Sequence, residues 1–126
     1  MILNLLGKHN PLVFDRIQLN PYCSYKIRLI SYNAVLSSKP SIGIYKLTTN
    51  LTERELGSSS RILAFFVIED RSKIITFNPK SEIWFKLRLQ DFSTAEVKLS
   101  SLTSDAELFF EEFSCQLEIL ETYGGL

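Results

Sequence analysis

The sequence predicts an all-β fold, an antiparallel β-sandwich, and three observations support this prediction. Apolar and polar residues alternate with a period of two along several segments, which places one face of each segment on a core and the other in water. Alternation of this kind is typical of antiparallel sheets, because doubly covered parallel strands are apolar on both faces. Turn-forming residues separate the segments at short, regular intervals, the spacing found in sandwiches and barrels.

The N-terminal part of the chain contains three expected strands. The first covers residues 12–19 and ends at the turn-forming pair Asn20-Pro21. The second covers residues 25–29, where apolar residues alternate with basic ones. The third covers residues 42–47 and follows Pro40, which ends any preceding element because proline lacks a backbone donor.

The middle of the chain contains a continuous apolar run at residues 62–68. A run of this length without polar residues predicts a central strand that is covered on both sides. Residues 69–72 are polar and predict a turn, after which residues 73–77 return as the hairpin partner of that strand. A second turn is expected at 78–81, and residues 83–89 then resume the alternation of a half-buried strand.

The C-terminal strands are expected at residues 96–102, 107–110 and 113–119, giving a total of about eight or nine. We therefore predict a single domain over residues 1–126, built as one jelly roll of about eight strands. Only residues 52–57 show a helical signature, a Thr and a Glu spaced as in a capping box before a glycine.

Charge and hydropathy limit the classes of function. A hydrophobic content of 45% argues against intrinsic disorder. The formal net charge is zero, which argues against a binder of duplex nucleic acid. The charge is nevertheless distributed unevenly along the chain, with a formal +5 over residues 1–63 and −5 over residues 64–126. Either the two halves pair and cancel within the sandwich, or they form complementary patches that favour head-to-tail contacts between copies.

The cysteines and the chain start bear on cellular location. Cys23 and Cys115 have no zinc-binding spacing. A disulfide between them stays open, although the alternating register around Cys115 favours a buried free thiol. No segment approaches the ~20 apolar residues of a membrane span, and the first residues lack the basic region of a signal peptide. We expect no membrane span and a location in a virion or in the interior of a host cell.

Motifs for catalysis or for a cofactor are not found in the sequence. His9 is the only histidine and has no nucleophile motif beside it, so we interpret it as an exposed loop residue. Five glutamates crowd towards the C-terminus and could supply an acid pair of the glycosidase type. We interpret them instead as a solvated face or a partner patch, at Glu107, Glu111, Glu112, Glu118 and Glu121. We expect no enzyme, no cofactor and no metal.

The candidate binding residues come from the polar faces of two alternating strands. Lys26 and Arg28 lie on the first of these faces, and Trp84, Lys86 and Arg88 lie on the second. An aromatic ring bordered by cations can stack on a sugar or a base, or anchor a protein interface. The alternative is that the sandwich buries Trp84 at an edge, beneath a loop.

Three further residues complete the candidate set. Tyr45 is a second candidate for a stacking platform, and Glu111 and Glu112 are candidates for a protein interface.

One segment resembles a known family. Residues 14–29, continued through residues 38–42, resemble the opening of small β-sandwich virion proteins of Polinton/Maverick-type elements and their relatives. The shared features are a Phe-containing strand, an Ile-x-Leu step and a strand that begins Tyr-x-Ile-x-Leu before a Ser/Pro loop. The resemblance covers about a quarter of the chain and stops after Pro40, where an aromatic and Asn-rich continuation is missing. It implies a sandwich fold and a structural role in a virion.

The C-terminal Gly124-Gly125 resembles the cleavage context of adenovirus-like maturation proteases, which such elements commonly encode. A terminal Gly-Gly is also similar to the end of ubiquitin-like modifiers, but that fold requires an amphipathic helix that this sequence lacks. We expect a flexible chain end here, and processing stays open.

Together these features predict a non-enzymatic structural module, most specifically a capsid-associated protein of the minor-capsid or penton type. Its expected partners are copies of itself, as a trimer or pentamer, and other capsid proteins. An exposed sheet edge needs a partner or protection, and symmetric assembly supplies partners. The alternatives are a carbohydrate-binding or receptor-attachment module that uses Trp84 or Tyr45, and a small glycan-acting enzyme.

Overall fold

The computed structural model describes residues 1–8, 12–52, 62–88, 91–103 and 107–122. The fold is all-β, and the sheets are antiparallel, as the sequence predicts. No helix occurs among the residues described, so that part of the chain contains no helix that could cross a membrane. The strands are β1 (Ile2–Gly7), β2 (Leu12–Gln18), β3 (Ser24–Leu36), β4 (Gly43–Thr49), β5 (Ile62–Ile68), β6 (Ile74–Phe77), β7 (Phe85–Lys86), β8 (Asp91–Ala95), β9 (Val97–Ser101), β10 (Glu107–Leu108) and β11 (Phe110–Thr122).

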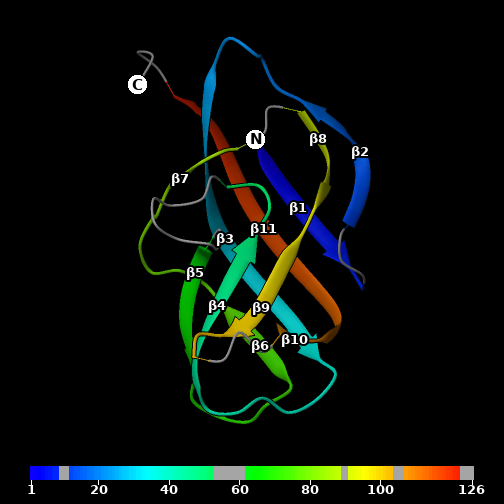
Figure 1. Ribbon diagram of the computed structural model, residues 1–126, viewed down its shortest axis with the longest axis vertical. Helices are drawn as coiled ribbons and strands as arrows, with labels where there is room; N and C mark the ends of the chain where they lie inside the picture. Colours follow the sequence, from blue (N-terminus) through cyan, green and yellow to red (C-terminus); the bar gives the residue numbers. More distant parts are fainter. Residues whose placement is uncertain (9–11, 53–61, 89–90, 104–106, 123–126) are drawn as a thin grey trace.

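The strands form two larger sheets and a small one (Figure 1). The first sheet has the order β1-β11-β3-β6, with β7 paired to the far end of β3. The second sheet has the order β10-β9-β4-β5, and β2 pairs with β8 separately. Strands β3 and β11 are the longest, at 13 residues each, and they pair along most of their length.

The core is formed by side chains from both larger sheets. Strand alternation buries Ile27, Leu29 and Leu117 from the first sheet. Leu47 and Leu99, which are opposite each other in the second sheet, are also fully buried. The two layers therefore share one apolar cluster, which gives the fold a sandwich-like arrangement.

An aromatic contact links strands of different sheets within this arrangement. The rings of Phe66 on β5 and Phe77 on β6 stack with their centroids 4.9 Å apart. Because β5 belongs to the second sheet and β6 to the first, the contact joins the two layers.

Several predicted elements are confirmed. Residues 12–19 correspond to β2, residues 42–47 to β4 and residues 96–102 to β9. The alternating segments at 25–29 and 113–119 lie within β3 and β11. The sequence prediction missed β1 and β8, and the expected eight or nine strands are eleven in the part of the chain that the structure describes.

The prediction for residues 62–68 was wrong in two respects. This strand, β5, is the last strand of its sheet, and Phe65 and Val67 are 51% and 57% exposed, so it is not covered on both faces. It also forms no hairpin with residues 73–77. Strand β6 pairs with β3 instead, because the chain crosses from one sheet to the other after Ile68.

The predicted strand at 83–89 was also too long. Only Phe85 and Lys86 form a strand, and Ile83, expected on the core face, is 58% exposed. The helical turn expected at 52–57 lies outside the described residues except for Thr52, which forms an isolated bridge with Leu87. His9 and Gly124-Gly125 lie outside the described residues as well.

The structure answers the question of the two thiols. Cys115 is buried on β11, and no disulfide joins it to Cys23. The predicted buried thiol is therefore confirmed. Burial raises the pKa of Cys115 to about 12, because the thiolate would lose its hydration.

Candidate binding surface

The pairing of β3 with β7 brings most of the predicted binding residues together. In this antiparallel pair, Lys26 lies opposite Lys86 and Ile27 lies opposite Phe85. Lys26 and Arg28 share one face of β3 because they are two residues apart. Lys86 lies opposite Lys26 and therefore on the same face. Trp84 is two residues before Lys86, so its side chain lies on this face as well. We call Lys26, Arg28, Glu82, Trp84 and Glu118 the Trp84 cluster.

Two cations lie over the ring of Trp84. The Lys26 Nζ atom is 4.4 Å from the ring centroid, and the Arg28 Cζ atom is 5.4 Å from it. Both distances fall within the range of cation–π attraction. The indole nitrogen donates a hydrogen bond of 3.4 Å to Oε2 of Glu82. The ring is half-buried, so part of it stays accessible to solvent.

Arg28 connects this ring to two carboxylates. Its Nε donates to Oε1 of Glu118 on β11 over 2.7 Å, and its Nη2 lies 3.9 Å from Oε1 of Glu82. The side chains of Arg28 and Glu118 are only 23% and 22% exposed, whereas that of Glu82 is 66% exposed. Arg28 therefore ties β3 to its neighbour β11 and to the segment before β7.

Five candidate residues lie outside this cluster, namely Lys86, Arg88, Tyr45, Glu111 and Glu112. Tyr45 is only 4% exposed, and its hydroxyl donates a 2.7 Å hydrogen bond to the carbonyl of Ser41. The structure therefore corrects the interpretation of Tyr45 as a stacking platform, because strand alternation turns its ring into the core. Glu111 and Glu112 are exposed on β11, where Glu112 lies opposite Val35 of β3.

The separation of these acids from the Trp84 cluster follows from strand geometry. Val35 is nine positions beyond Lys26 on β3, which corresponds to about 30 Å at the rise of an extended strand. The predicted binding residues therefore do not form a single site, because Glu111 and Glu112 lie far from the Trp84 cluster. Arg88 is exposed two residues after β7, and its backbone N–H donates to the carbonyl of Leu51 over 2.7 Å.

The two carboxylates of the cluster, Glu82 and Glu118, were not predicted from the sequence. Glu82 lies between the predicted turn at 78–81 and the predicted strand at 83–89, and Glu118 was considered only as one of five C-terminal acids. The alternation along β11 does show that Glu118 faces away from the core. Its partner Arg28 is 90 positions away in the sequence, and only the pairing of β3 with β11 brings the two together.

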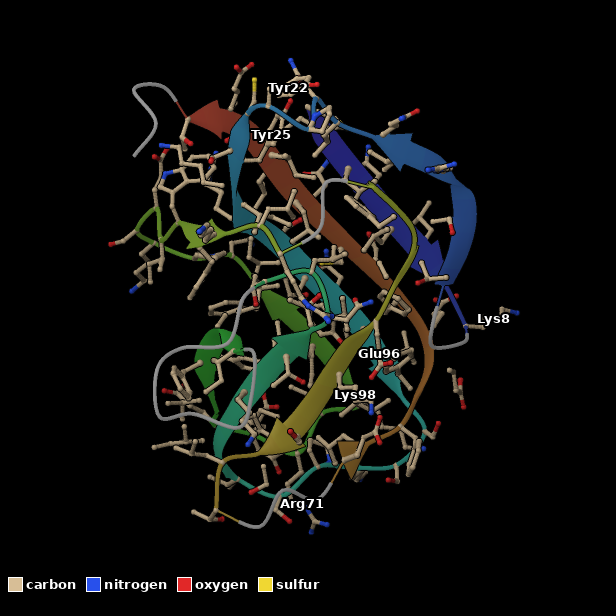
Figure 2. All side chains as sticks on the ribbon, turned by 45° about the horizontal axis from the view of Figure 1, so that its top comes forward. Lys8, Tyr22, Tyr25, Arg71, Glu96 and Lys98 are labelled. Carbon is tan, nitrogen blue, oxygen red and sulfur yellow. The ribbon has the colours of Figure 1, made fainter. Side chains whose placement is uncertain are left out.

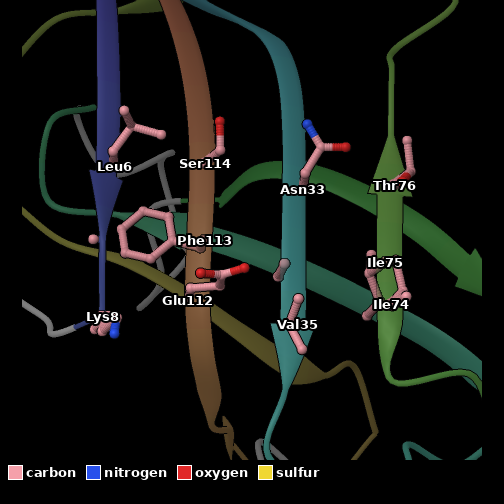
Figure 3. A pocket seen from close by; sticks show the side chains of 12 residues that line it. Leu6, Lys8, Asn33, Val35, Ile74, Ile75, Thr76, Glu112, Phe113 and Ser114 are labelled. Carbon is pink, nitrogen blue, oxygen red and sulfur yellow. The ribbon is translucent and has the colours of Figure 1, made fainter.

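A separate groove crosses the outer face of the first sheet (Figure 3). Its volume is about 490 Å³, and strands β1, β11, β3 and β6 all contribute to it. One row of side chains runs across all four strands, and strand register aligns these residues as Leu6, Ser114, Asn33 and Thr76. Three of these four side chains are polar, namely Ser114, Asn33 and Thr76.

The next row across the groove combines charge with apolar contact. Glu112 and Val35 are cross-strand neighbours, and Val35 lies opposite Ile74 in turn. Lys8 lies at the other end of the row, beside β1. Ile74 is 68% exposed, so the β6 end of this second row is apolar and open. Glu112 thus belongs to this groove and not to the Trp84 cluster.

The outer face of the second sheet carries a different kind of surface. Ile44 on β4 is 49% exposed and lies directly opposite Val67 on β5. Phe65 is two positions before Val67 on the same face and is equally open. We call Ile44, Phe65 and Val67 the β5 apolar patch. It occupies the end of a sheet, where a further strand could be added.

No protein-family model, curated protein or solved structure matches the chain. Among the described residues, no group of three or more His, Cys, Asp and Glu side chains is arranged to hold a metal ion.

Proposed function

We propose that this chain is a non-enzymatic structural module that assembles with copies of itself through its β-sheets. The observation that carries the proposal is the β5 apolar patch at the end of the second sheet. Contiguous apolar surface bordered by polar residues marks an interaction site in proteins. The zero net charge adds no long-range repulsion between copies.

The finer form of the proposal is a single jelly roll, and the strand order supports it. Strands β8 and β9 are separated only by Glu96, so they count as one bent strand. Leaving out the two-residue strands β7 and β10, one sheet has the order first-eighth-third-sixth. The other then has the order second-seventh-fourth-fifth. Two such four-stranded sheets make an eight-stranded jelly roll.

The most specific version is a capsid-associated virion protein of the minor-capsid or penton type. Jelly rolls recur in viral capsid domains, and the N-terminal segment resembles virion proteins of Polinton/Maverick-type elements. Fold alone does not determine function, so this version depends on the assembly that the apolar patch supports.

Sedimentation or light scattering of the purified chain tests the assembly. We expect a mass above the 14.5 kDa of one chain, increasing with concentration to a defined multiple. Electron microscopy of the concentrated sample then distinguishes rings or particles from open chains. A mass that stays at one chain over the whole soluble range contradicts the proposal.

Jelly rolls also occur in lectins, but the geometry of Trp84 does not favour the carbohydrate-binding alternative. Lys26 and Arg28 already lie over its ring, so a sugar would have to displace them. Binding to a glycan array that is lost in Trp84→Ala would favour that alternative over assembly.

A further inference from the structure

Strand β5 has one edge without a strand partner in the described part of the chain. It pairs with β4 from Ile62 to Ile68, and the sheet order ends there. All seven of its residues are apolar, with no charge or proline among them. An edge strand presents unpaired backbone N–H and C=O groups, and proteins usually protect such edges with charges, prolines or bulges. Backbone groups in this arrangement are complementary to another extended strand.

The side chains on β5 narrow the choice of that strand. Its outer face carries Phe65 and Val67, both more than half exposed, so the incoming strand must be apolar on this face as well. Beyond Ile68 the chain becomes acidic at Glu69 and Asp70, both exposed. The incoming strand must therefore avoid placing acids at this end.

We propose that the partner of β5 is the β5 strand of a second copy of this chain, paired antiparallel across a two-fold axis at Phe66. This inference rests on the proposed function and names the surface of assembly. In this register, Phe65 of each copy lies opposite Val67 of the other. The β5 apolar patches of the two copies then join into one band, and the two four-stranded sheets become one of eight.

Three features favour this pairing over the alternatives. An uncharged strand meets no like charge when it pairs with itself. Antiparallel pairing separates the Glu69-Asp70 ends of the two copies by about the length of the strand, roughly 20 Å. Parallel pairing would bring those four acids side by side, and like charges directly opposite each other destabilise a sheet. An isologous contact is also the commonest form of association between identical chains.

A two-fold contact by itself gives dimers. The trimer or pentamer expected from the sequence therefore needs a second surface, and the β5 pairs would then join copies in neighbouring rings. The outer-face groove between β1 and β6 is a separate surface on the other sheet, and this proposal leaves it accessible.

Disulfide trapping tests the register. In a Cys23→Ser background, Phe65→Cys and Val67→Cys chains are prepared separately, mixed and oxidised. Directly opposed residues of an antiparallel pair have Cβ atoms about 5 Å apart, within reach of a disulfide after a small shift. We expect the mixture to form a linked dimer at least tenfold faster than Phe65→Cys mixed with Ile2→Cys. Ile2 is a matched control because it is 48% exposed on β1, an edge strand of the other sheet.

The outcomes separate the two proposals. Trapping that is no faster than in the Ile2 control overturns the β5 pairing, and faster trapping in Phe65→Cys alone overturns the register. Light scattering of Val67→Lys adds a second measurement, because a lysine on an edge strand opposes pairing. We expect self-association to weaken about tenfold or more, with Ile2→Lys unchanged and far-UV circular dichroism native in both. Association that persists in Val67→Lys overturns the inference but keeps the proposed function. A wild-type chain that is always monomeric contradicts the proposed function.

Discussion

The ion pair of Arg28 with Glu118 should contribute measurably to stability, and a double-mutant cycle can isolate its contribution. Arg28→Met keeps most of the side-chain stem, and Glu118→Gln keeps the shape while removing the charge. The free energy of unfolding of both single variants and of the double variant gives the coupling energy of the pair. The contacts that Arg28 makes with Trp84 and Glu82 do not enter this coupling energy, because their loss is common to the Arg28→Met variant and the double variant and cancels.

The expected magnitude follows from the geometry. The Arg28 Nε and Glu118 Oε1 atoms are 2.7 Å apart, and both side chains are little more than a fifth exposed. A charge-assisted hydrogen bond contributes about 1.5–3 kcal/mol, and the partial loss of hydration at both groups reduces this gain. We therefore expect a coupling of about 1–2 kcal/mol. Each kcal/mol lost lowers the melting temperature by about 4 °C for a domain of this size.

The chain contains a matched control for exposure. Lys98 and Glu96 lie beside each other (Figure 2), with Nζ and Oε1 2.9 Å apart. Their side chains are 46% and 34% exposed, and exposed pairs of this kind couple by only about 0.2–1 kcal/mol. The same cycle with Lys98→Met and Glu96→Gln measures this value. Hydrogen bonding to Glu96 raises the pKa of Lys98, so the Lys98 ammonium group stays charged near neutral pH.

Urea titrations of all variants at 0.1 M and 1 M salt complete the assay. The screening length falls from about 10 Å to about 3 Å between these concentrations, so the exposed pair should lose most of its coupling. The Arg28–Glu118 pair should keep most of its coupling, because it is shorter and less exposed. A coupling below about 0.5 kcal/mol, or one no larger than that of the control pair, refutes the view that Arg28 ties β3 to β11.

Two further predictions concern buried polar groups. The hydroxyl of Tyr32 is fully buried and has no hydrogen-bond partner among the described residues. Tyr32→Phe should therefore raise the free energy of unfolding by up to about 1 kcal/mol, and a loss above 1 kcal/mol in urea titration would show that the hydroxyl is bonded. Burial raises the pKa of Cys115 to about 12, so its thiol stays protonated at pH 8. The contribution of the buried Cys115 thiol to the free energy of unfolding is fully present below the usual thiol pKa and is lost as the pH rises towards 12. Ellman's reagent at pH 8 should therefore label Cys23 in the native protein and Cys115 only after unfolding, and native labelling of a Cys23→Ser variant would contradict this burial.

The sequence could predict the strands whose alternation matches their burial. Leu29 and Leu117 fall on the apolar face of alternating segments, and both are buried. A period of two records which face of a strand meets the core. It does not record where the strand lies in the sheet. The apolar run at 62–68 therefore looked like a central strand, although Phe65 and Val67 are exposed at an edge.

The pairing of strands was less accessible to prediction because it depends on contacts that are distant in sequence. A short polar segment after Ile68 suggested a hairpin, but the chain crosses to the other sheet. The stacked rings of Phe66 and Phe77 show what stabilises this crossing, since the contact spans the two layers. No local pattern distinguishes a turn within a sheet from a turn between sheets.

The candidate site was predictable to a similar extent. Strand alternation predicted that Lys26, Arg28 and Trp84 lie on the polar faces of their strands, and the structure brings these three side chains together. The identity of the acids that pair with Arg28 could not be predicted, because β11 becomes its neighbour only in the folded sheet. The prediction of an exposed Tyr45 was wrong, because the residues around it do not show which face of β4 meets the core.

The unequal charge of the two halves of the chain has a different meaning in the folded protein. The first sheet alternates between them, since β1 and β3 come from the basic half and β11 and β6 from the acidic half. Arg28 and Glu118 show this cancellation in a single contact. Cancellation within the sheet weakens the argument for head-to-tail rings held by complementary patches. The uncharged edge of β5 is then the better-supported route to assembly, and it predicts association that changes little with salt.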